Sequence, residues 1–222
     1  SFFHSTILQH NSFSSAIADQ LSNDLSNISV QPMMLRKVIR EAINSSNEIL
    51  EATVSDLNAV KDRDPSCKYF SEPLLFFKGF KALQSHRVAS WLWSEQRQTL
   101  AHFIQSRASE VYGIDIHPAA QVGKGVMIDH GSGVVIGETA VVEDNVSIFQ
   151  GVTLGGTGKE IGDRHPKVRE GALLSASSTI LGNVEIGKNA KVAAGSVVLV
   201  DVREHTTVAG VPAKEVGEAK TD

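Results

Sequence analysis

A histidine next to an acidic residue is the first place in this sequence where chemistry is expected. His130 directly follows Asp129, and Asp115 lies a short distance upstream. A neutral imidazole can take a hydroxyl proton near physiological pH, and a carboxylate on its other nitrogen fixes the tautomer and stabilises the imidazolium. Neighbouring residues on a strand face opposite sides, so Asp129 should point away from His130. We therefore predict that His130 is a general base oriented by Asp115.

A charged loop supplies a second group of candidates. Between the aliphatic residues Leu154 and Val168 the chain runs for fourteen residues where the surrounding pattern uses six. The excess of eight residues must project as a loop, and it carries Arg164 and His165. Loops on a rigid scaffold often carry function. A histidine inside a repeat is commonly structural, but a His/Asp pair beside a basic loop favours chemistry, and the two groups are expected to meet in one cleft.

A six-residue repeat must position these candidates. An aliphatic residue opens each hexad, with one two-residue phase shift at Val134–Ile136 and the interruption after Leu154. Neither a helix nor a single strand has this period, whereas a parallel β-helix does. A β-sandwich would instead show alternation, with turn clusters about every 8–12 residues. The openers are Ile116, Val122, Ile128, Val134, Ile136, Val142, Ile148, Leu154, Val168, Leu174, Ile180, Ile186, Val192 and Val198.

Composition excludes several other classes. The 222 residues carry a formal net charge of −4 without a run of lysine or arginine, which argues against a nucleic-acid partner. No apolar stretch approaches the roughly 20 residues of a membrane span, and no charged and apolar leader opens the chain. The single Cys67 excludes an intramolecular disulfide framework. We expect a cytoplasmic protein with no membrane partner.

The first part of the chain has helical periodicity. Helix-spaced apolar residues occupy 32–43, 50–60 and much of 73–111. Ser12 or Ser14 can cap an earlier helix, and Gly113 can end the last one in an αL conformation. The apolar pattern that already starts at Phe2 indicates that the natural N-terminus lies further upstream. We predict a helical domain over 1–113, a β-helix over 114–205 with a loop at 155–167, and a tail over 206–222.

Several motifs together resemble those of serine O-acetyltransferase, a family of the hexapeptide acyltransferase superfamily that starts cysteine synthesis from serine. The motifs are Arg63–Pro65, Asp115–Ala120, Ile128–His130, Gly137–Ala140, Gly151–Lys159, Gly162–Lys167 and Ala209–Ala213. With the apolar stretch 73–93, the resemblance covers nearly the whole chain. It implies an α plus left-handed parallel β-helix fold: an all-helical N-terminal domain, then a hexapeptide-repeat β-helix with one excluded loop.

The resemblance also implies a reaction and its residues. The family transfers acetyl directly from acetyl-CoA to the hydroxyl of L-serine, and His130 and Asp115 match its catalytic pair. The family's serine pocket, which also receives the feedback inhibitor L-cysteine, is matched by Asp64, Asp129, Arg164 and His165. Arg164 can pair with the amino-acid carboxylate, and the two aspartates can bind the ammonium group.

Acetyl-CoA is expected to be a co-substrate, with no permanently bound cofactor and no metal. Backbone N–H groups at 156–158, with His165, could stabilise the tetrahedral oxyanion. In the superfamily, CoA lies along the outside of the β-helix between subunits. The expected contacts here are Gly156, Thr157, Gly158, Ala176, Ala194 and Lys214.

Partners follow from the same resemblance. Superfamily members form homotrimers with active sites between subunits, and the helical domain resembles one that joins two trimers into a hexamer. The family has a longer tail whose terminal isoleucine inserts into cysteine synthase, the O-acetylserine sulfhydrylase. Here the chain stops at Asp222 without that tail, so complex formation with the sulfhydrylase is left open.

Three alternatives remain at this stage. A hexapeptide O-acetyltransferase acting on a sugar or antibiotic hydroxyl could use the same base. It would not need Asp64 and Arg164, which are expected to bind the ammonium and carboxylate groups of an amino acid. A γ-carbonic-anhydrase-like enzyme needs three histidine ligands on neighbouring coils, whereas His117 and His130 lie thirteen residues apart and His165 is on a loop. A non-enzymatic scaffold leaves the charged loop unexplained.

Overall fold

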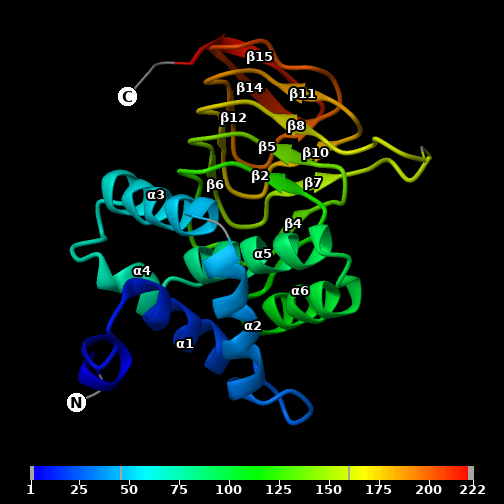
Figure 1. The fold of residues 1–222 in the computed structure, drawn as a ribbon. Helices are drawn as coiled ribbons and strands as arrows, with labels where there is room; N and C mark the ends of the chain where they lie inside the picture. The colour runs from blue at the N-terminus through cyan, green and yellow to red at the C-terminus, as the bar shows by residue number, and fades with distance from the viewer. Residues whose placement is uncertain (1–2, 46, 160, 220–222) are drawn as a thin grey trace.

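Helices form the N-terminal part of the chain and a parallel β-helix forms the rest (Figure 1). This computed structural model describes residues 3–45, 47–159 and 161–219. The helices are η1 (His4–Leu8), α1 (Phe13–Leu25), α2 (Pro32–Ser45), α3 (Asn47–Arg63), α4 (Ser71–Phe76), α5 (Lys78–Ser94) and α6 (Gln98–Tyr112). Ser12 caps α1 by accepting a hydrogen bond from the Ser15 N–H, and Gly113 ends α6 with a φ of 70°. Both caps were predicted.

The strands lie on three faces, called A, B and C below, in the repeating order A, B, C along the chain. Face A holds β1 (Ile114–Ile116), β4 (Val134–Ile136), β7 (Thr153–Gly155), β10 (Thr179–Leu181) and β13 (Val197–Val198). Face B holds β2 (Gln121–Val122), β5 (Val141–Val142), β8 (Lys167–Val168) and β11 (Glu185–Ile186). Face C holds β3 (Met127–Ile128), β6 (Ser147–Ile148), β9 (Leu173–Leu174), β12 (Lys191–Val192), β14 (Thr206–Gly210) and β15 (Ala213–Glu218). The predicted left-handed parallel β-helix is confirmed.

Stacked aliphatic side chains form the interior of the β-helix. In face A, Ile136 pairs with Ile116 below it and with Leu154 above it. All three are at most 5% exposed. Strands in a sheet are about 4.8 Å apart, so each hexad opener packs on its counterpart in the next coil. Burying one such side chain contributes about 1.5–3 kcal/mol, which explains why the repeat rule dominates the sequence.

The structure relocates the phase shift in this repeat. Val134 was predicted to open a hexad, but it pairs with Ile114, while Ile136 is the counterpart of Ile116. The two additional residues therefore lie in the turn 129–133, between β3 and β4. The turn can absorb them because Gly131 and Gly133 adopt positive φ values of 80° and 79°. The insertion thus coincides with His130 rather than following it.

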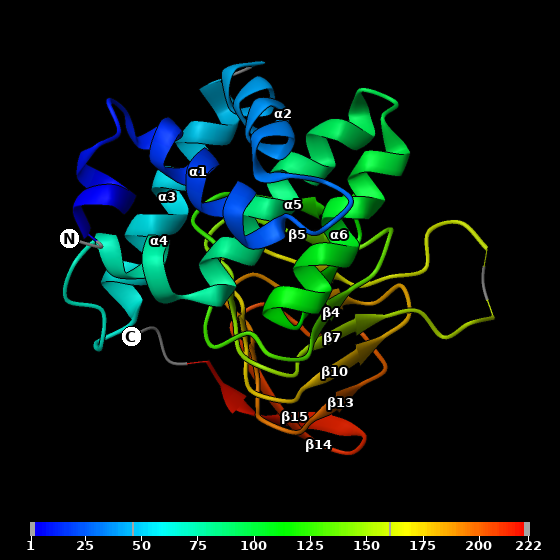
Figure 2. The same ribbon diagram turned by 90° about the horizontal axis from the view of Figure 1, so that it is seen from below.

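The predicted loop leaves the coil after β7 and returns at β8. It projects from one side of the stack in Figure 1 and Figure 2. Ile161 within it is fully exposed, whereas His165 near its end is only 7% exposed. The returning end is therefore anchored against the β-helix.

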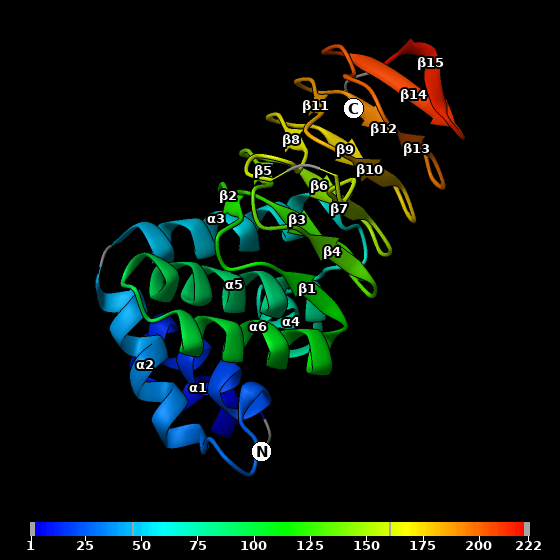
Figure 3. The ribbon, with the colours of Figure 1, turned by 90° about the vertical axis from the view of Figure 1, so that its right-hand side faces the viewer.

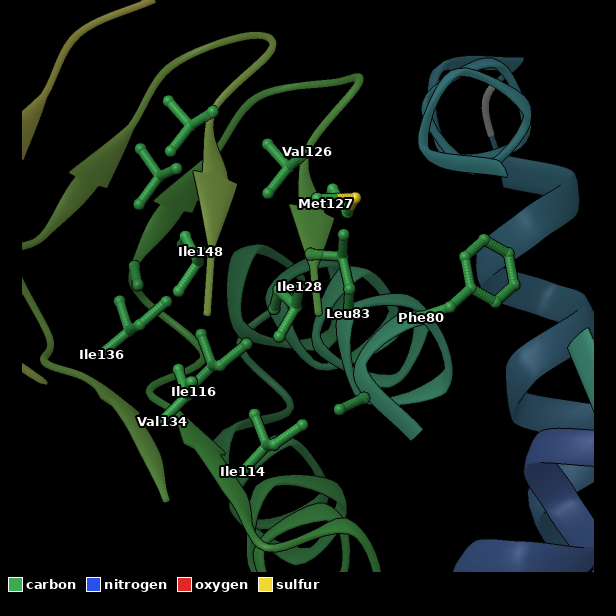
Figure 4. Close-up of a cluster of buried hydrophobic side chains, with 14 of the residues drawn as sticks. Phe80, Leu83, Ile114, Ile116, Val126, Met127, Ile128, Val134, Ile136 and Ile148 are labelled. Carbon is green, nitrogen blue, oxygen red and sulfur yellow. The ribbon is translucent and has the colours of Figure 1, made fainter. Parts of the chain in front are cut away.

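Helices α5 and α6 lie across the first coil (Figure 2 and Figure 3). Leu83 of α5 packs beside Ile128, which closes the lower end of the interior (Figure 4). A Cβ on Gly79 would lie 2.0 Å from the Ile128 carbonyl oxygen, so only glycine permits this approach. A buried ion pair also links the two parts, because Asp56 of α3 binds Arg87 of α5 at 2.7 Å and accepts the Val126 N–H at 3.0 Å.

Residues 206–219 of the predicted tail extend face C. Strand β14 pairs in parallel with β12, and β15 then runs antiparallel to β14. Residues 220–222 lie outside the described part. In the ranges that the structure describes, no helix has the length and apolar character required to span a bilayer.

Candidate active site

His130 stands on the corner between face C and face A, called the CA edge. It follows β3 and adopts a left-handed φ of 54°. Its Nε2 atom lies 3.9 Å from Asp129 Oδ2, and its side chain is 73% exposed. The prediction that Asp129 points away from His130 was wrong, because both residues have left the strand and the alternation of a strand no longer applies.

A small cavity brings together three predicted residues. It has a volume of about 230 Å³, and Asp64, Asp129 and His130 are among its lining residues. The Asp64 Oδ1 atom accepts the Ser66 N–H at 2.8 Å, which fixes the carboxylate just after the end of α3. We call these three residues the base pocket. The pocket combines an exposed imidazole with two carboxylates, which suits a cationic amine with a neighbouring hydroxyl.

The first turn of α5 forms another wall of this cavity. Lys78 lines it and donates from Nζ to the Ser132 hydroxyl on the same corner. The contact of Gly79 with the Ile128 carbonyl brings the helix this close. The geometry of the base pocket therefore depends on how the helical part docks on the first coil.

A second group of residues lies on the corner between face A and face B, the AB edge. Arg164 Nη2 donates to Glu138 Oε2 at 2.6 Å, and this hydrogen bond lowers the pKa of Glu138. The Thr139 hydroxyl oxygen accepts the backbone N–H groups of Arg164 and His165 at 3.0 and 3.1 Å. The returning end of the loop is thus fixed by the corner that follows β4.

His165 has a defined tautomer in this group. The Thr139 backbone N–H can only donate, and it lies 3.2 Å from His165 Nδ1, so the neutral ring carries its proton on Nε2. Burial lowers the pKa of His165, and the charges of Arg164 and Lys167 lower it further. A Cβ on Gly137 would lie 2.0 Å from the ring, so glycine is needed to admit it. His165 is therefore a neutral hydrogen-bond donor.

Asp115 belongs with this second group rather than with His130. It lies on β1, and its Oδ1 atom accepts a hydrogen bond from Gln105 Nε2 at 2.8 Å. His117 stands on the same edge; burial lowers its pKa, and Glu138, Asp115 and Arg164 act on it electrostatically. We call Asp115, His117, Glu138, Arg164 and His165 the arginine cluster.

The predicted site residues therefore fall on two edges that flank face A. Across the described ranges, no hydrogen bond or ion pair connects Asp115 with His130. The expectation that all candidates meet in one cleft is not met within one chain, because the coil places the corners after β3 and after β4 at opposite sides of the face. The expected acetyl-CoA contacts divide in the same way: 156–158 adjoin the AB edge, Ala176 and Ala194 are on the CA edge, and Lys214 is on β15.

Sequence reasoning gave no role to several residues of the site. Glu138 was noted only as a departure from the repeat, and Thr139 only as part of a motif. Lys78 and Gln105 lie on the helices α5 and α6, outside the motifs that carry the candidates. No spacing rule connects them to the corners, because their positions depend on how the helices dock.

The comparisons with known proteins agree with the resemblance. Residues 1–85 match the family model "Serine acetyltransferase, N-terminal", and residues 165–199 match "Bacterial transferase hexapeptide (six repeats)". The chain is 50% identical over 222 residues to serine acetyltransferase of Escherichia coli K12, covering 100% of this chain and 81% of that protein. The chain belongs to the serine acetyltransferase family.

Solved serine acetyltransferases have the same fold. The Brucella abortus enzyme in complex with coenzyme A has a TM-score of 0.98 at 47% identity, with 100% of this chain and 88% of that one covered. The Neisseria gonorrhoeae enzyme in complex with serine has a TM-score of 0.94 at 49% identity, with 96% of this chain and 88% of that one covered. A serine acetyltransferase in complex with cysteine has a TM-score of 0.96 at 51% identity, with 97% of this chain and 90% of that one covered.

Proposed function

We propose that the base pocket of one copy of the chain and the arginine cluster of a second copy form one active site. The reaction is that of the serine acetyltransferase family: acetyl passes from acetyl-CoA to the L-serine hydroxyl, giving O-acetyl-L-serine and CoA, the first step of cysteine biosynthesis from serine. The observation that carries the shared site is the position of His130 on one edge of face A, with Asp115 and Arg164 on the other.

His130 would act as the general base. An imidazole nitrogen takes the proton of the serine hydroxyl while the serine oxygen attacks the acetyl carbonyl carbon. Collapse of the tetrahedral intermediate expels the CoA thiolate, which receives the proton back from the imidazolium. Asp115 of the second copy would accept a hydrogen bond from the other ring nitrogen, which fixes the tautomer and stabilises the charged ring.

Both charged ends of serine find partners in this arrangement. Asp64 and Asp129 beside the cavity would bind the ammonium group. Arg164 would bind the carboxylate, since its Nη1 and Nη2 atoms contact Gly162 and Glu138 while Nε makes no hydrogen bond within the described part of the chain. Cysteine differs from serine only in its side-chain sulfur, and a relative is known in complex with cysteine. The same pocket would therefore bind cysteine as a feedback inhibitor.

The developing oxyanion needs hydrogen-bond donors. His165 offers a neutral Nε2–H, and the backbone at 156–158 adjoins it, because a Cβ on Gly156 would lie 3.5 Å from His165 Nε2. Such fixed donors stabilise charge that appears only in the transition state. CoA would lie along the β-helix between copies, contacting Gly156, Thr157 and Gly158 of one and Ala176 and Ala194 of the other, with Lys214 near the far end.

The assembly is part of this proposal. A trimer would bring the CA edge of each copy against the AB edge of its neighbour, and the helical region 1–113 would join two trimers. The division into 1–113, 114–205 and 206–222, and the cytoplasmic location, stay predictions. Binding of O-acetylserine sulfhydrylase stays open.

The reaction is tested by CoA-thiol release from acetyl-CoA with and without L-serine, with cysteine then titrated in. Release that depends on serine and is suppressed by cysteine supports both the reaction and the pocket. Release only with a sugar or aminoglycoside would contradict it.

The shared site is tested by co-expressing His130→Ala with Arg164→Ala. Each variant alone is expected to be nearly inactive, and mixed oligomers should regain part of the activity, because some interfaces then pair an intact base pocket with an intact arginine cluster. Mixtures that stay inactive while forming hybrid oligomers would contradict a site shared between copies.

A further inference from the structure

A chain of hydrogen bonds leads from helix α6 to Asp115. The ring of His102 contacts Gln105 through Nδ1 and Oε1 at 3.0 Å, and Gln105 Nε2 donates to Asp115 Oδ1 at 2.8 Å. We propose that Gln105 is a positioning residue for acetyl transfer, which holds the Asp115 carboxylate in the orientation that meets His130 of a second copy. This inference rests on the proposed role of Asp115.

The direction of each bond in this chain is determined. A carboxylate oxygen can only accept, so the amide nitrogen of Gln105 must face Asp115 and its oxygen must face His102. Because the amide oxygen is also only an acceptor, His102 Nδ1 must carry a proton. The amide of Gln105 is therefore held at both ends and cannot rotate without losing two hydrogen bonds.

The helix that carries Gln105 is itself fixed. Ala101 and Ile104 of the same helix, α6, are completely buried. Trp93 packs edge-on against both His102 and His117, with ring centroids 5.2 Å apart in each case. Since α6 leads through Gly113 directly into β1, Gln105 and Asp115 are held on two neighbouring rigid elements.

Asp115 needs such a restraint. Its Oδ2 atom makes no hydrogen bond in the described ranges, so it is available to an imidazole from outside the chain. Asp115 and Arg164 both act electrostatically on His117, so all three residues belong to the same edge. Without the amide of Gln105, no side chain in the described ranges would hold the Asp115 carboxylate, which could then rotate away from the neighbouring copy. Gln105 thereby restrains the group that orients the base.

The test compares Gln105→Leu and Gln105→Glu with a matched control, Gln98→Leu, at an exposed position in the first turn of the same helix. Loss of one hydrogen bond to a charged group predicts a fall in kcat of about tenfold for Gln105→Leu. The KM values for serine and acetyl-CoA should stay unchanged. Gln105→Glu keeps the shape but replaces the donor with a like charge, so it should be at least as slow. The control should match the wild type.

Two further readouts separate positioning from a structural role. A less well-placed Asp115 stabilises the imidazolium less, so the acidic limb of the kcat profile should move to lower pH, in the same direction as in Asp115→Asn. In the Asp115→Asn background, Gln105→Leu should cause no further loss, because the amide acts only through that carboxylate.

Additive losses in the double variant, or a raised KM with unchanged kcat, would overturn the positioning role. Wild-type kcat in Asp115→Asn would instead refute the proposed role of Asp115 itself. Equal melting temperatures and oligomer sizes are required of all variants; a variant that fails this check is replaced by Gln105→Asn, whose shorter side chain should not reach Asp115 and should show the same kcat loss.

Discussion

The base pocket and the arginine cluster differ in how tightly their histidines are held. The His130 side chain is 73% exposed and lies 3.9 Å from its nearest carboxylate. His165 is 7% exposed; the Thr139 N–H donates to its ring, and its own backbone N–H donates to the Thr139 hydroxyl oxygen, which fixes the loop. A group that recognises charge benefits from being fixed before the substrate arrives. A group that must gain and lose a proton can complete its contacts when a second copy and the substrates close around it.

The largest expected effect is on the chemical step, and it comes from a change in the base pocket. His130→Ala should lower kcat at least a hundredfold, as expected for loss of a general base. The melting temperature should stay close to the wild type because the side chain is exposed. Steady-state assays with saturating serine and acetyl-CoA measure this effect. Near-normal turnover would remove His130 from the mechanism and with it the distinction between the two regions.

The arginine cluster should act mainly on affinity. Arg164→Ala removes a charge-assisted contact to the amino-acid carboxylate, worth about 1.5–3 kcal/mol, so the affinity for serine should fall roughly ten- to a hundredfold. The inhibition constant for cysteine should rise by a similar factor. Arg169→Ala is a matched control, because Arg169 pairs with Glu143 and Glu185 on face B. Unchanged cysteine inhibition would show that the two ligands use different pockets.

Two glycines make close contacts beside the two regions: Gly79 beside the base pocket and Gly137 in the arginine cluster. Replacing each by alanine compares how the two regions are held in place. Gly79→Ala would place a methyl group 2.0 Å from a backbone oxygen of β3, whereas Gly137→Ala would place one 2.0 Å from a side chain, the ring of His165. Overpacking against backbone costs about 1–3 kcal/mol, so Gly79→Ala should lower the melting temperature and also kcat. Gly137→Ala should chiefly raise the KM for serine. The melting temperature, kcat and KM of both variants are measured. A raised KM alone for Gly79→Ala, with a lowered melting temperature and kcat for Gly137→Ala, would contradict these assignments.

The smallest expected effect is a pH dependence of stability. The pKa of His165 is lowered in the folded chain, whereas in the unfolded chain it should be near 6.5. Below about pH 6.5 the unfolded state therefore binds the proton more readily than the folded state. The free energy of unfolding should therefore fall as pH decreases from about 6.5, by at most about 1.4 kcal/mol per pH unit for this one group. His165→Asn should flatten the curve there. Denaturant unfolding between pH 7 and 5 tests it, and parallel curves for the two proteins would argue against a neutral, buried ring.

The sequence was sufficient for features that obey a local rule. The hexad openers predicted the coil because each must pack on its counterpart one turn away, and the surplus after Leu154 predicted the loop because eight residues exceed what a corner can hold. The caps at Ser12 and Gly113 depend only on neighbouring residues.

Other features depend on the exact phase of the repeat or on contacts between separate elements, which local sequence patterns do not predict. A two-residue error in phase changes which residue stands on a corner, which is why Val134 was misassigned. Asp129 was expected to point away because strand alternation was applied beyond the end of β3. The Glu138–Arg164 pair joins residues on two different coils. The contact of Gln105 with Asp115 depends on the angle at which α6 enters β1. His130, Asp115 and the charged loop were recognised from residue types and positions, and the remaining candidates came from the family motifs. The assignment of all of them to two edges needed the coil.

Strand β15 has a consequence for the protein in a concentrated solution. A parallel stack presents an unpaired edge that could recruit further strands from other molecules and lead to aggregation. On face C the last strand runs antiparallel, breaks the register between Thr207 and Val208, and is almost entirely exposed. Lys214, Glu215 and Glu218 place charges along it, and Arg203 pairs with Glu215. Face C, which ends in this strand, is therefore a poor template for the addition of strands from other molecules.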